Sequence, residues 1–89
     1  MDIDLRPLAR RQLLDIYDWT ADRFGEPQAA RYLRQLNEAL ERIAAAPFLG
    51  PIYRDRIRRV VAGSHLIYYE VQRDRIVVLR IDHGRQRRY

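Results

Sequence analysis

The residues of this chain that are best suited to chemistry on a phosphodiester lie in its second half. His65 and His83 are its two histidines, Arg85 follows the second of them closely, and Tyr89 is the last residue. An arginine can hold a phosphate while a histidine or a tyrosine moves a proton, so these four residues form a candidate catalytic set. Side chains of these types are more often solvated or structural than catalytic. We therefore expect no catalytic residue here and treat the set as the alternative interpretation.

The charge of the same segment indicates binding instead. All 17 residues counted as lysine or arginine are arginine, and the formal net charge is +5. Residues 1–53 carry seven arginines against eight acidic residues, whereas residues 54–89 carry ten against four. Positive charge concentrated in one part of a small domain favours an anionic partner, which is either nucleic acid or an acidic protein. The candidate target-binding residues are Arg80, Arg85, Arg87 and Arg88.

The composition excludes several classes of site. The chain has no cysteine, which excludes disulfides and thiolate metal sites and favours a reducing compartment. Its two histidines fall on different predicted strands without paired acidic residues nearby, so we expect no metal. It has no glycine-rich phosphate loop and no nucleophile elbow, so we expect no cofactor. Residues 1–5 lack a signal-peptide pattern and no apolar run reaches membrane-spanning length, which predicts a cytoplasmic protein without a membrane partner.

The spacing of apolar residues predicts the elements that position these groups. Residues 2–6 alternate polar and apolar side chains and predict a short strand. Pro7 suits the first position of a helix, and Gly25 suits its end. A second helix with a clear apolar stripe follows directly and ends at Pro47. The tight connection between the two predicts an antiparallel helical hairpin.

Beyond residue 47 the apolar period changes to two. Residues 57–62, 65–72 and 75–83 are rich in Val, Ile, Leu and Tyr and predict a three-stranded antiparallel meander. The chain, residues 1–89, is thus predicted to be one α+β domain with the order strand, helical hairpin, meander. Both faces of the predicted strands are partly apolar. One face should therefore cover the helices, and the other should stay open as an apolar surface for a partner.

Trp19 lies beside the apolar stripe of the first helix rather than within it. The default interpretation is that such a residue lies at the edge of the core, and the second interpretation is that it contacts a partner. Arg58 and Arg59 are neighbours on a predicted strand and must point to opposite faces, so at most one of them can join the basic patch. The candidate partner-binding residues are Tyr17, Trp19 and Arg58.

Several segments together resemble the RelE/ParE toxins of bacterial type II toxin–antitoxin modules, over essentially the whole chain. The matching segments are residues 5–9 (LRPLA), 13–17 (LLDIY), 24–25 (FG), 29–30 (AA), 47–50 (PFLG), 63–69 (GSHLIYY) and 78–85 (VLRIDHGR). Each segment is weak alone, and their order and spacing carry the resemblance. It implies a helical hairpin followed by an antiparallel sheet, in agreement with the elements expected above. It also implies a toxin held inactive by a cognate antitoxin, which we expect to contact Tyr17, Trp19 and Arg58.

The family divides by target, and two positions favour the ParE-like branch, which inhibits DNA gyrase. Where members of the other branch, the RelE-like ribosome-dependent mRNA interferases, often have arginine in a Gly-x-Arg-Leu segment, this chain has His65. In the basic segment after the last strand, the second basic position is Gln86. We therefore expect a gyrase inhibitor that acts by binding and not by catalysis. Ribosome-dependent mRNA cleavage through His65, His83, Arg85 and Tyr89 is the alternative, and a toxin-like fold that has kept only partner binding is a third.

Overall fold

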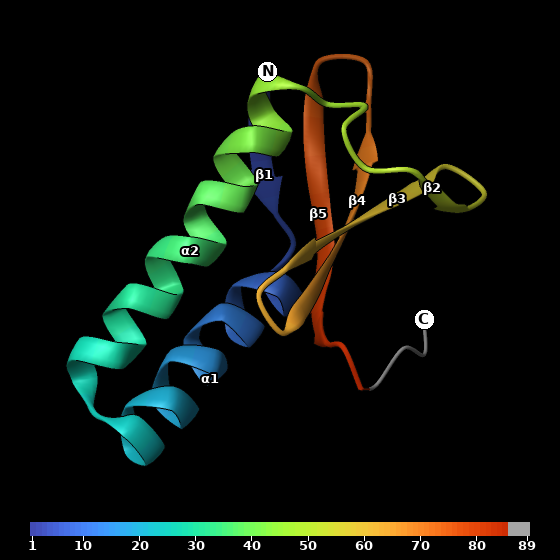
Figure 1. Ribbon diagram of the computed structural model, residues 1–89. Helices are drawn as coiled ribbons and strands as arrows, with labels where there is room; N and C mark the ends of the chain where they lie inside the picture. Colours follow the sequence, from blue (N-terminus) through green and yellow to red (C-terminus); the bar gives the residue numbers. More distant parts are fainter. Residues whose placement is uncertain (86–89) are drawn as a thin grey trace.

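The computed structural model describes residues 1–85 and shows two helices packed on one face of a five-stranded sheet (Figure 1). The elements in chain order are β1 (Asp2–Leu5), α1 (Pro7–Phe24), α2 (Glu26–Ala45), β2 (Ile52–Arg54), β3 (Ile57–Ala62), β4 (His65–Val71) and β5 (Arg75–His83). The order of strands across the sheet is β1-β5-β4-β3-β2. Three of the predicted site residues, Arg87, Arg88 and Tyr89, lie outside the described residues.

The helical hairpin forms as the sequence predicts. Pro7 occupies the first turn of α1, where its missing N–H costs no helical hydrogen bond. Gly25 separates the helices with a φ of 90°, which residues with a side chain rarely adopt. Its N–H donates to the carbonyl of Ala21 at 2.9 Å, and its carbonyl accepts the N–H of Ala29 at 3.1 Å. Gly25 is therefore the single residue between the end of α1 and the start of α2, and the helices run antiparallel.

The predicted meander is confirmed as β3, β4 and β5, and the sheet contains two more strands. β1 pairs in parallel with β5, with Ile3 opposite Ile76. The short β2 pairs antiparallel with β3, with Ile52 opposite Arg58. Sequence analysis did not predict β2, because three residues are too few to show a period of two. It predicted the first strand without its parallel pairing, because that pairing joins opposite ends of the chain.

A bulge interrupts the pairing of β4 with β5. The register steps from Tyr68 opposite Arg80 to Tyr69 opposite Val78, which leaves Leu79 as an extra residue in β5. A bulge of this kind reverses the alternation of faces along the strand that contains it. The core-facing residues of β5 are therefore Ile76 and Val78 before the bulge and Ile81 after it, a step of three positions instead of two.

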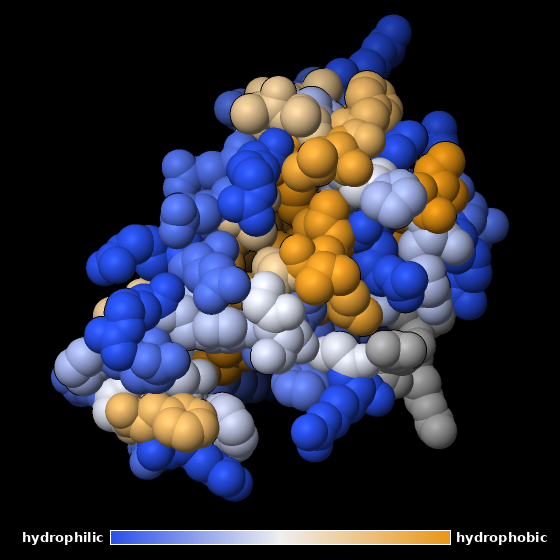
Figure 2. Space-filling view, viewed as in Figure 1, coloured by the Kyte–Doolittle hydropathy of each residue, from blue (hydrophilic) through white to orange (hydrophobic). Residues whose placement is uncertain are grey.

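The core lies between the helical hairpin and the sheet. Buried side chains from α1, α2, β3, β4 and β5 meet there, and partly buried residues of β1 pack against them. The buried members are Ala9, Leu36, Ala39, Leu40, Ile43, Ala62, Ile67, Tyr69, Ile76, Val78 and Ile81. Figure 2 shows hydrophilic side chains over most of the outward side of the helices and apolar side chains over the strands beside α2. Among residues 1–85, neither helix is long and apolar enough to cross a membrane.

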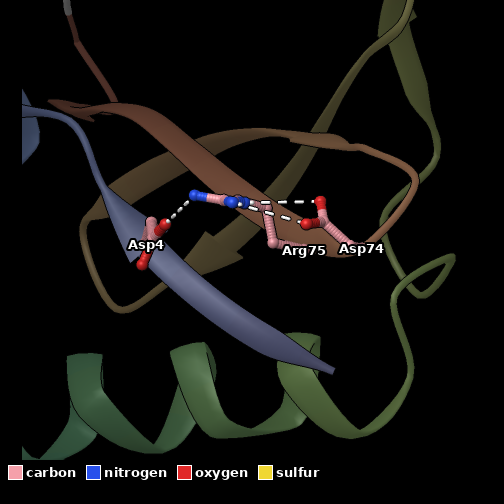
Figure 3. Close-up of polar contacts among 3 residues, drawn as sticks. All are labelled: Asp4, Asp74 and Arg75. Carbon is pink, nitrogen blue, oxygen red and sulfur yellow. Dashed lines mark hydrogen bonds and ion pairs between the residues drawn. The ribbon is translucent and has the colours of Figure 1, made fainter.

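An ion-pair cluster joins β1 to the start of β5 (Figure 3). The guanidinium of Arg75 lies 3.0 Å from the carboxylate of Asp4 and 3.4 Å from that of Asp74. Arg75 lowers the pKa of the Asp74 carboxyl, first through their hydrogen bond and then through its charge. All three side chains are exposed, so water and salt screen the pairs. The cluster aligns the parallel strand pair and adds little to stability.

The face of the sheet opposite the helices is not the open apolar surface that the sequence predicts, and most of that prediction is wrong. Leu66, Tyr68 and Val77 are all buried. The ring of Tyr53 packs edge-on against Tyr68 with 5.4 Å between centroids, and the guanidinium of Arg59 lies 4.4 Å from the Tyr53 centroid. The sequence pattern shows which residues are apolar, but it does not show that β2 brings the Tyr53 ring against Tyr68. Val61, which pairs with Leu66 and shares its face, stays 69% exposed, so part of the predicted apolar surface remains.

Candidate functional site

A groove lies between the tip of the helical hairpin and the adjoining ends of β4 and β5; we call it the hairpin groove. Its volume is about 660 Å³. The residues that line it are Asp15, Ile16, Trp19, Thr20, Phe24, Gln28, Tyr32, Ser64, His65, His83 and Arg85. The groove brings Trp19, predicted to contact a partner, together with His65, His83 and Arg85, predicted to serve catalysis or target binding. The structure thus merges two surfaces that the sequence analysis kept apart.

A second hollow of about 580 Å³ shares four residues with the hairpin groove. Its lining residues are Val61, Gly63, Ser64, His65, Leu66, His83, Gly84 and Arg85. The shared residues are Ser64, His65, His83 and Arg85. They form the boundary between the two hollows, so a group bound at either hollow meets the same imidazoles and the same guanidinium.

Tyr32 of α2 holds the turn between β3 and β4 against the helices. Its hydroxyl accepts the backbone N–H of Ser64 at 2.9 Å and is hydrogen-bonded to His65 Nδ1 at 2.5 Å. Gly63 has a φ of +59°, and a Cβ at this position would lie 2.7 Å from the Tyr32 ring. A glycine is therefore required both for the turn and for the approach of the ring. No spacing in the sequence links residue 32 to residue 64, so the sequence alone gives no signal for this contact.

The two histidines face each other across the β4–β5 ladder. His65 is directly opposite His83, and their rings make an edge contact with 5.2 Å between centroids. The backbone N–H of Arg85 donates to His83 Nδ1 at 3.1 Å. The pKa of His65 is lowered, first by burial and then by the proximity of His83, while the charge of Asp82 opposes this in part. His65 is therefore neutral near pH 7.

The opposite end of the groove is aromatic. Trp19 and Phe24 are 55% and 64% exposed, and their rings make an edge contact with 6.2 Å between centroids. The guanidinium of Arg23 lies 4.8 Å from the Trp19 ring. Exposed aromatic side chains that line a concave surface are typical of partner-binding sites. The groove therefore has an apolar end on α1 and a polar end with imidazoles and a guanidinium.

Arg80, predicted to bind the target, makes an ion pair inside the domain. Its Nε donates to Asp82 Oδ1 at 2.9 Å, and the Asp82 side chain is fully buried. Gln12 of α1 donates to the same carboxylate oxygen at 3.1 Å and accepts the backbone N–H of Ile81 at 2.6 Å. Arg80 therefore has a structural role, because it offsets a buried negative charge that links α1 to β5. Its role in target binding stays a prediction.

The three predicted antitoxin-binding residues do not form one cluster. Trp19 lines the hairpin groove, whereas Tyr17 is half-buried on α1 and does not line it. Arg58 donates to the carbonyl of Gly50 at 2.8 Å and lies 4.9 Å from the ring of Phe48. It holds the loop after α2, near the end of β3 that is far from the groove. Adjacent positions on a strand allow a residue's face to be predicted but not its partners.

Metal binding has no support in the geometry of the described part of the chain. No group of three or more His, Cys, Asp or Glu residues within 1–85 is placed to hold a metal ion. The hairpin groove offers hydrogen-bond donors and a positive charge instead. That arrangement suits an anionic group more than a cation.

Comparison with known proteins agrees with the fold and extends the assignment to a family. The sequence matches the family model of the ParE toxin of type II toxin–antitoxin system, parDE, over residues 3–88. Toxin ParE1 of Mycobacterium tuberculosis (strain ATCC 25618 / H37Rv) is 40% identical over 85 residues, covering 91% of this chain and 87% of that protein. Toxin ParE1 of Caulobacter vibrioides (strain ATCC 19089 / CIP 103742 / CB 15) is 36% identical over 78 residues, covering 84% and 80%.

A solved structure described as the chromosomal ParDE TA system from P. aeruginosa contains a chain of the same fold. The TM-score is 0.83, over 93% of this chain and 95% of that chain. At 20% identity this likeness shows the fold alone. The family model, which matches nearly the whole sequence, and the two relatives carry the assignment further: the chain belongs to the ParE toxin family of type II toxin–antitoxin systems.

Proposed function

We propose that this chain acts in the cytoplasm as a toxin that inhibits DNA gyrase, and that a cognate antitoxin neutralises it by occupying the hairpin groove. Membership of the ParE family supports the target, as do His65 and Gln86 at positions where the interferase branch often has basic residues. The observation that carries the proposal is the groove itself, with exposed aromatic side chains at one end and Arg85 with two imidazoles at the other.

The chemistry of the groove fits a protein segment better than a folded surface. A volume of about 660 Å³ accommodates a few side chains of a strand or helix laid along it. Trp19 and Phe24 provide an apolar wall for anchoring residues. An antitoxin segment that orders on binding would supply both the anchors and an acidic group. The chain's net charge of +5 favours the approach of such an acidic segment.

Messenger-RNA cleavage is the second candidate, because the structure brings His65, His83 and Arg85 to one place. A histidine pair that cleaves RNA by acid–base catalysis must admit the scissile phosphate between its proton-transferring atoms. Here the rings touch, with 5.2 Å between centroids, which leaves no room for a phosphate between them. This contact favours binding over cleavage.

Induced expression without the antitoxin tests the proposal. Growth arrest accompanied first by gyrase-linked DNA breaks, and relieved by co-expression of the antitoxin, is the expected result. Cleavage of ribosome-bound mRNA before any DNA damage would establish the second candidate. Full growth with soluble protein would indicate a toxin-like domain that has kept only partner binding.

A charge-reversal variant extends this test to the target-binding residues. Replacing Arg85, Arg87 and Arg88 with Glu should abolish growth arrest, because target binding is proposed to depend on this basic segment. The matched control replaces three exposed arginines on the helices, Arg10, Arg11 and Arg34, with Glu. The control has the same change in net charge and should keep the toxicity. Equal loss in both variants would show that overall charge and not this segment matters.

A further inference from the structure

Three large apolar side chains are exposed on the loop after α2 and at the start of β2. Phe48, its neighbour Leu49, and Ile52 are 67%, 51% and 60% exposed. The guanidinium of Arg58 lies 4.9 Å from the Phe48 ring, and Ile52 is directly opposite Arg58 in the β2–β3 pairing. Residues directly opposite each other in an antiparallel pair have neighbouring side chains on one face. These four residues therefore form one surface, which we call the loop patch.

The backbone of this loop is fixed from inside the domain although its apolar side chains are exposed. The Tyr69 hydroxyl accepts the N–H of Gly50 at 2.9 Å and donates to the carbonyl of Pro47 at 2.8 Å. Arg58 donates to the carbonyl of Gly50 at 2.8 Å. A Cβ on Gly50 would lie 2.8 Å from Cγ1 of Val60, so the loop packs directly against β3. A partner that binds here does not have to order the loop, which lowers the conformational entropy cost of binding.

The charge around the loop patch is positive. Residues 52–59 contain four arginines and one acidic residue, Asp55. Arg56 is exposed at the β2–β3 turn, and Arg58 lies within the patch. Apolar side chains that are exposed together mark an interaction surface, and positive charge beside them attracts an acidic partner.

The same features argue against two other occupants. A second copy of this chain would bring the arginines of two patches together, and like charges at an interface oppose association. Nucleic acid is bound by cationic side chains that follow its backbone and by aromatic rings on which bases stack. Leu49 and Ile52 have no ring for stacking, and the Arg58 guanidinium lies over the ring of Phe48. An acidic protein segment with apolar anchors fits this surface better than either.

The loop patch is separated from the hairpin groove by the length of β3. Arg58 is near the start of this strand, and Ser64, which lines the groove, follows its end. Six residues of a strand extend about 20 Å. Figure 1 shows the loop after α2 at the opposite end of the helices from the hairpin tip. A segment that occupies the groove with a few side chains therefore leaves the loop patch open.

We propose that the loop patch binds an acidic, amphipathic segment of a protein other than the antitoxin. Large apolar side chains of that segment pack on Phe48, Leu49 and Ile52, and its carboxylates pair with Arg56 and Arg58. The inference goes beyond the proposed function, because these five residues neither line the hairpin groove nor belong to the basic segment after β5. It also gives Arg58 a different partner from the antitoxin that the family resemblance implied.

Two peptide probes test the loop patch on the full chain. The probes are acetyl-Glu-Leu-Phe-Glu-Ile-Leu-Glu-amide and the same peptide with Gln in place of each Glu, and NMR of the backbone amides follows their binding. The Glu peptide should shift the signals of residues 46–58 and bind there about tenfold more tightly than the Gln peptide, because several exposed ion pairs each add a little affinity. Arg56→Gln should reduce this difference, whereas Arg34→Gln, the same change at an exposed position of α2, should leave it intact.

The apolar part of the loop patch has its own variants. Phe48→Ala and Leu49→Ala should each weaken binding at residues 46–58 by about tenfold, the usual effect of losing an anchoring side chain. Trp19→Ala, which removes an aromatic side chain of similar exposure from the hairpin groove, should leave this binding unchanged. Saturation with purified antitoxin should not displace the peptide from residues 46–58.

Shifts confined to the hairpin groove, equal affinities of the two peptides, or displacement of the peptide by the antitoxin would each overturn the inference. Stronger binding of a short oligothymidylate at residues 46–58 would replace it with a nucleic-acid surface, and dimerisation that is lost in Phe48→Ala would replace it with self-association. The peptide titrations need neither growth arrest nor gyrase. Their failure therefore leaves the proposed function standing, and expression without growth arrest would leave the loop patch standing.

Discussion

The hydroxyl of Tyr32 and Nδ1 of His65 are hydrogen-bonded across 33 positions of the sequence. This contact, with the bond from Ser64 to the same oxygen, is where α2 meets the turn between β3 and β4. It places His65 at the polar end of the hairpin groove, opposite the aromatic end on α1. The geometry of the hairpin groove therefore depends on one phenol that does not itself have to touch a partner.

Tyr32→Phe should lower the free energy of unfolding by about 1 to 2 kcal/mol, because two hydrogen bonds are lost and the ring is kept. Urea unfolding monitored by circular dichroism measures this change. Tyr53→Phe is the matched control, since among residues 1–85 its ring makes stacking contacts and its hydroxyl has no recorded hydrogen bond. Equal losses in the two variants would contradict the role assigned to Tyr32.

Tyr69→Phe should destabilise the fold by about 2 kcal/mol, the usual cost of leaving a buried donor without its acceptor. The Tyr69 hydroxyl accepts the N–H of Gly50 at 2.9 Å and donates to the carbonyl of Pro47 at 2.8 Å. It thus anchors the loop after α2 from inside the core. Thermal unfolding measures the loss, and hydrogen exchange should show that the Gly50 amide loses its protection. A loss below about 0.5 kcal/mol would show that the loop is held by other contacts.

Stability should fall as the pH is lowered from about 7.5 toward 5.5, in part because of His65. Burial and the proximity of His83 hold its pKa in the folded chain below the ordinary histidine value of 6.5, so the unfolded chain takes up the proton first. The contribution is therefore complete above about pH 6.5 and is lost as the pH falls toward the lowered pKa. Urea midpoints measured across this range should show a shallower slope in His65→Gln. An unchanged slope in that variant would assign the pH dependence to other groups.

Arg80→Gln and Arg85→Gln should differ in stability although they remove the same charge. Arg80 offsets the buried carboxylate of Asp82, and its loss should cost about 2 kcal/mol. Arg85 is exposed, and its substitution should change stability by less than about 0.5 kcal/mol. Loss of toxicity in Arg80→Gln can therefore be assigned to target binding only if the variant is still folded at the growth temperature. Equal stabilities would show that Asp82 does not need its partner.

Trp19→Ala should weaken antitoxin binding by about tenfold or more, as expected for an aromatic anchor at the centre of an interface. Its effect on stability should be small, because the side chain is 55% exposed. Phe48→Ala serves as the control, since Phe48 is 67% exposed and does not line the hairpin groove. Isothermal titration of the purified antitoxin into each variant measures the affinities. A larger loss from Phe48→Ala would place the antitoxin on the loop after α2.

Local chemistry was sufficient to predict the elements of this protein. Pro7 and Gly25 mark the limits of α1, because a proline tolerates the first helical turn and a glycine tolerates a positive φ. Apolar residues recur about every 3.6 positions in the helical hairpin and every two positions in the meander, because each element buries one face. This change of period separates the hairpin from the meander in the sequence. The resemblance to the RelE/ParE toxins followed from the same local segments, and the family assignment confirms it.

The functional surface depended on contacts between distant segments. Sequence analysis predicted partner contact for Trp19 and catalysis or target binding for His65, His83 and Arg85, but only the fold places them in one groove. It also predicted an open apolar sheet face, which the contact of Tyr53 with Tyr68 covers only in part. The period of the apolar residues predicts which side of a helix or strand is buried, because the residues that set this period are close together in the chain. Which residues meet across a groove depends on how the helices cross the sheet and on single long-range hydrogen bonds, and these are decided by the packing of the whole domain.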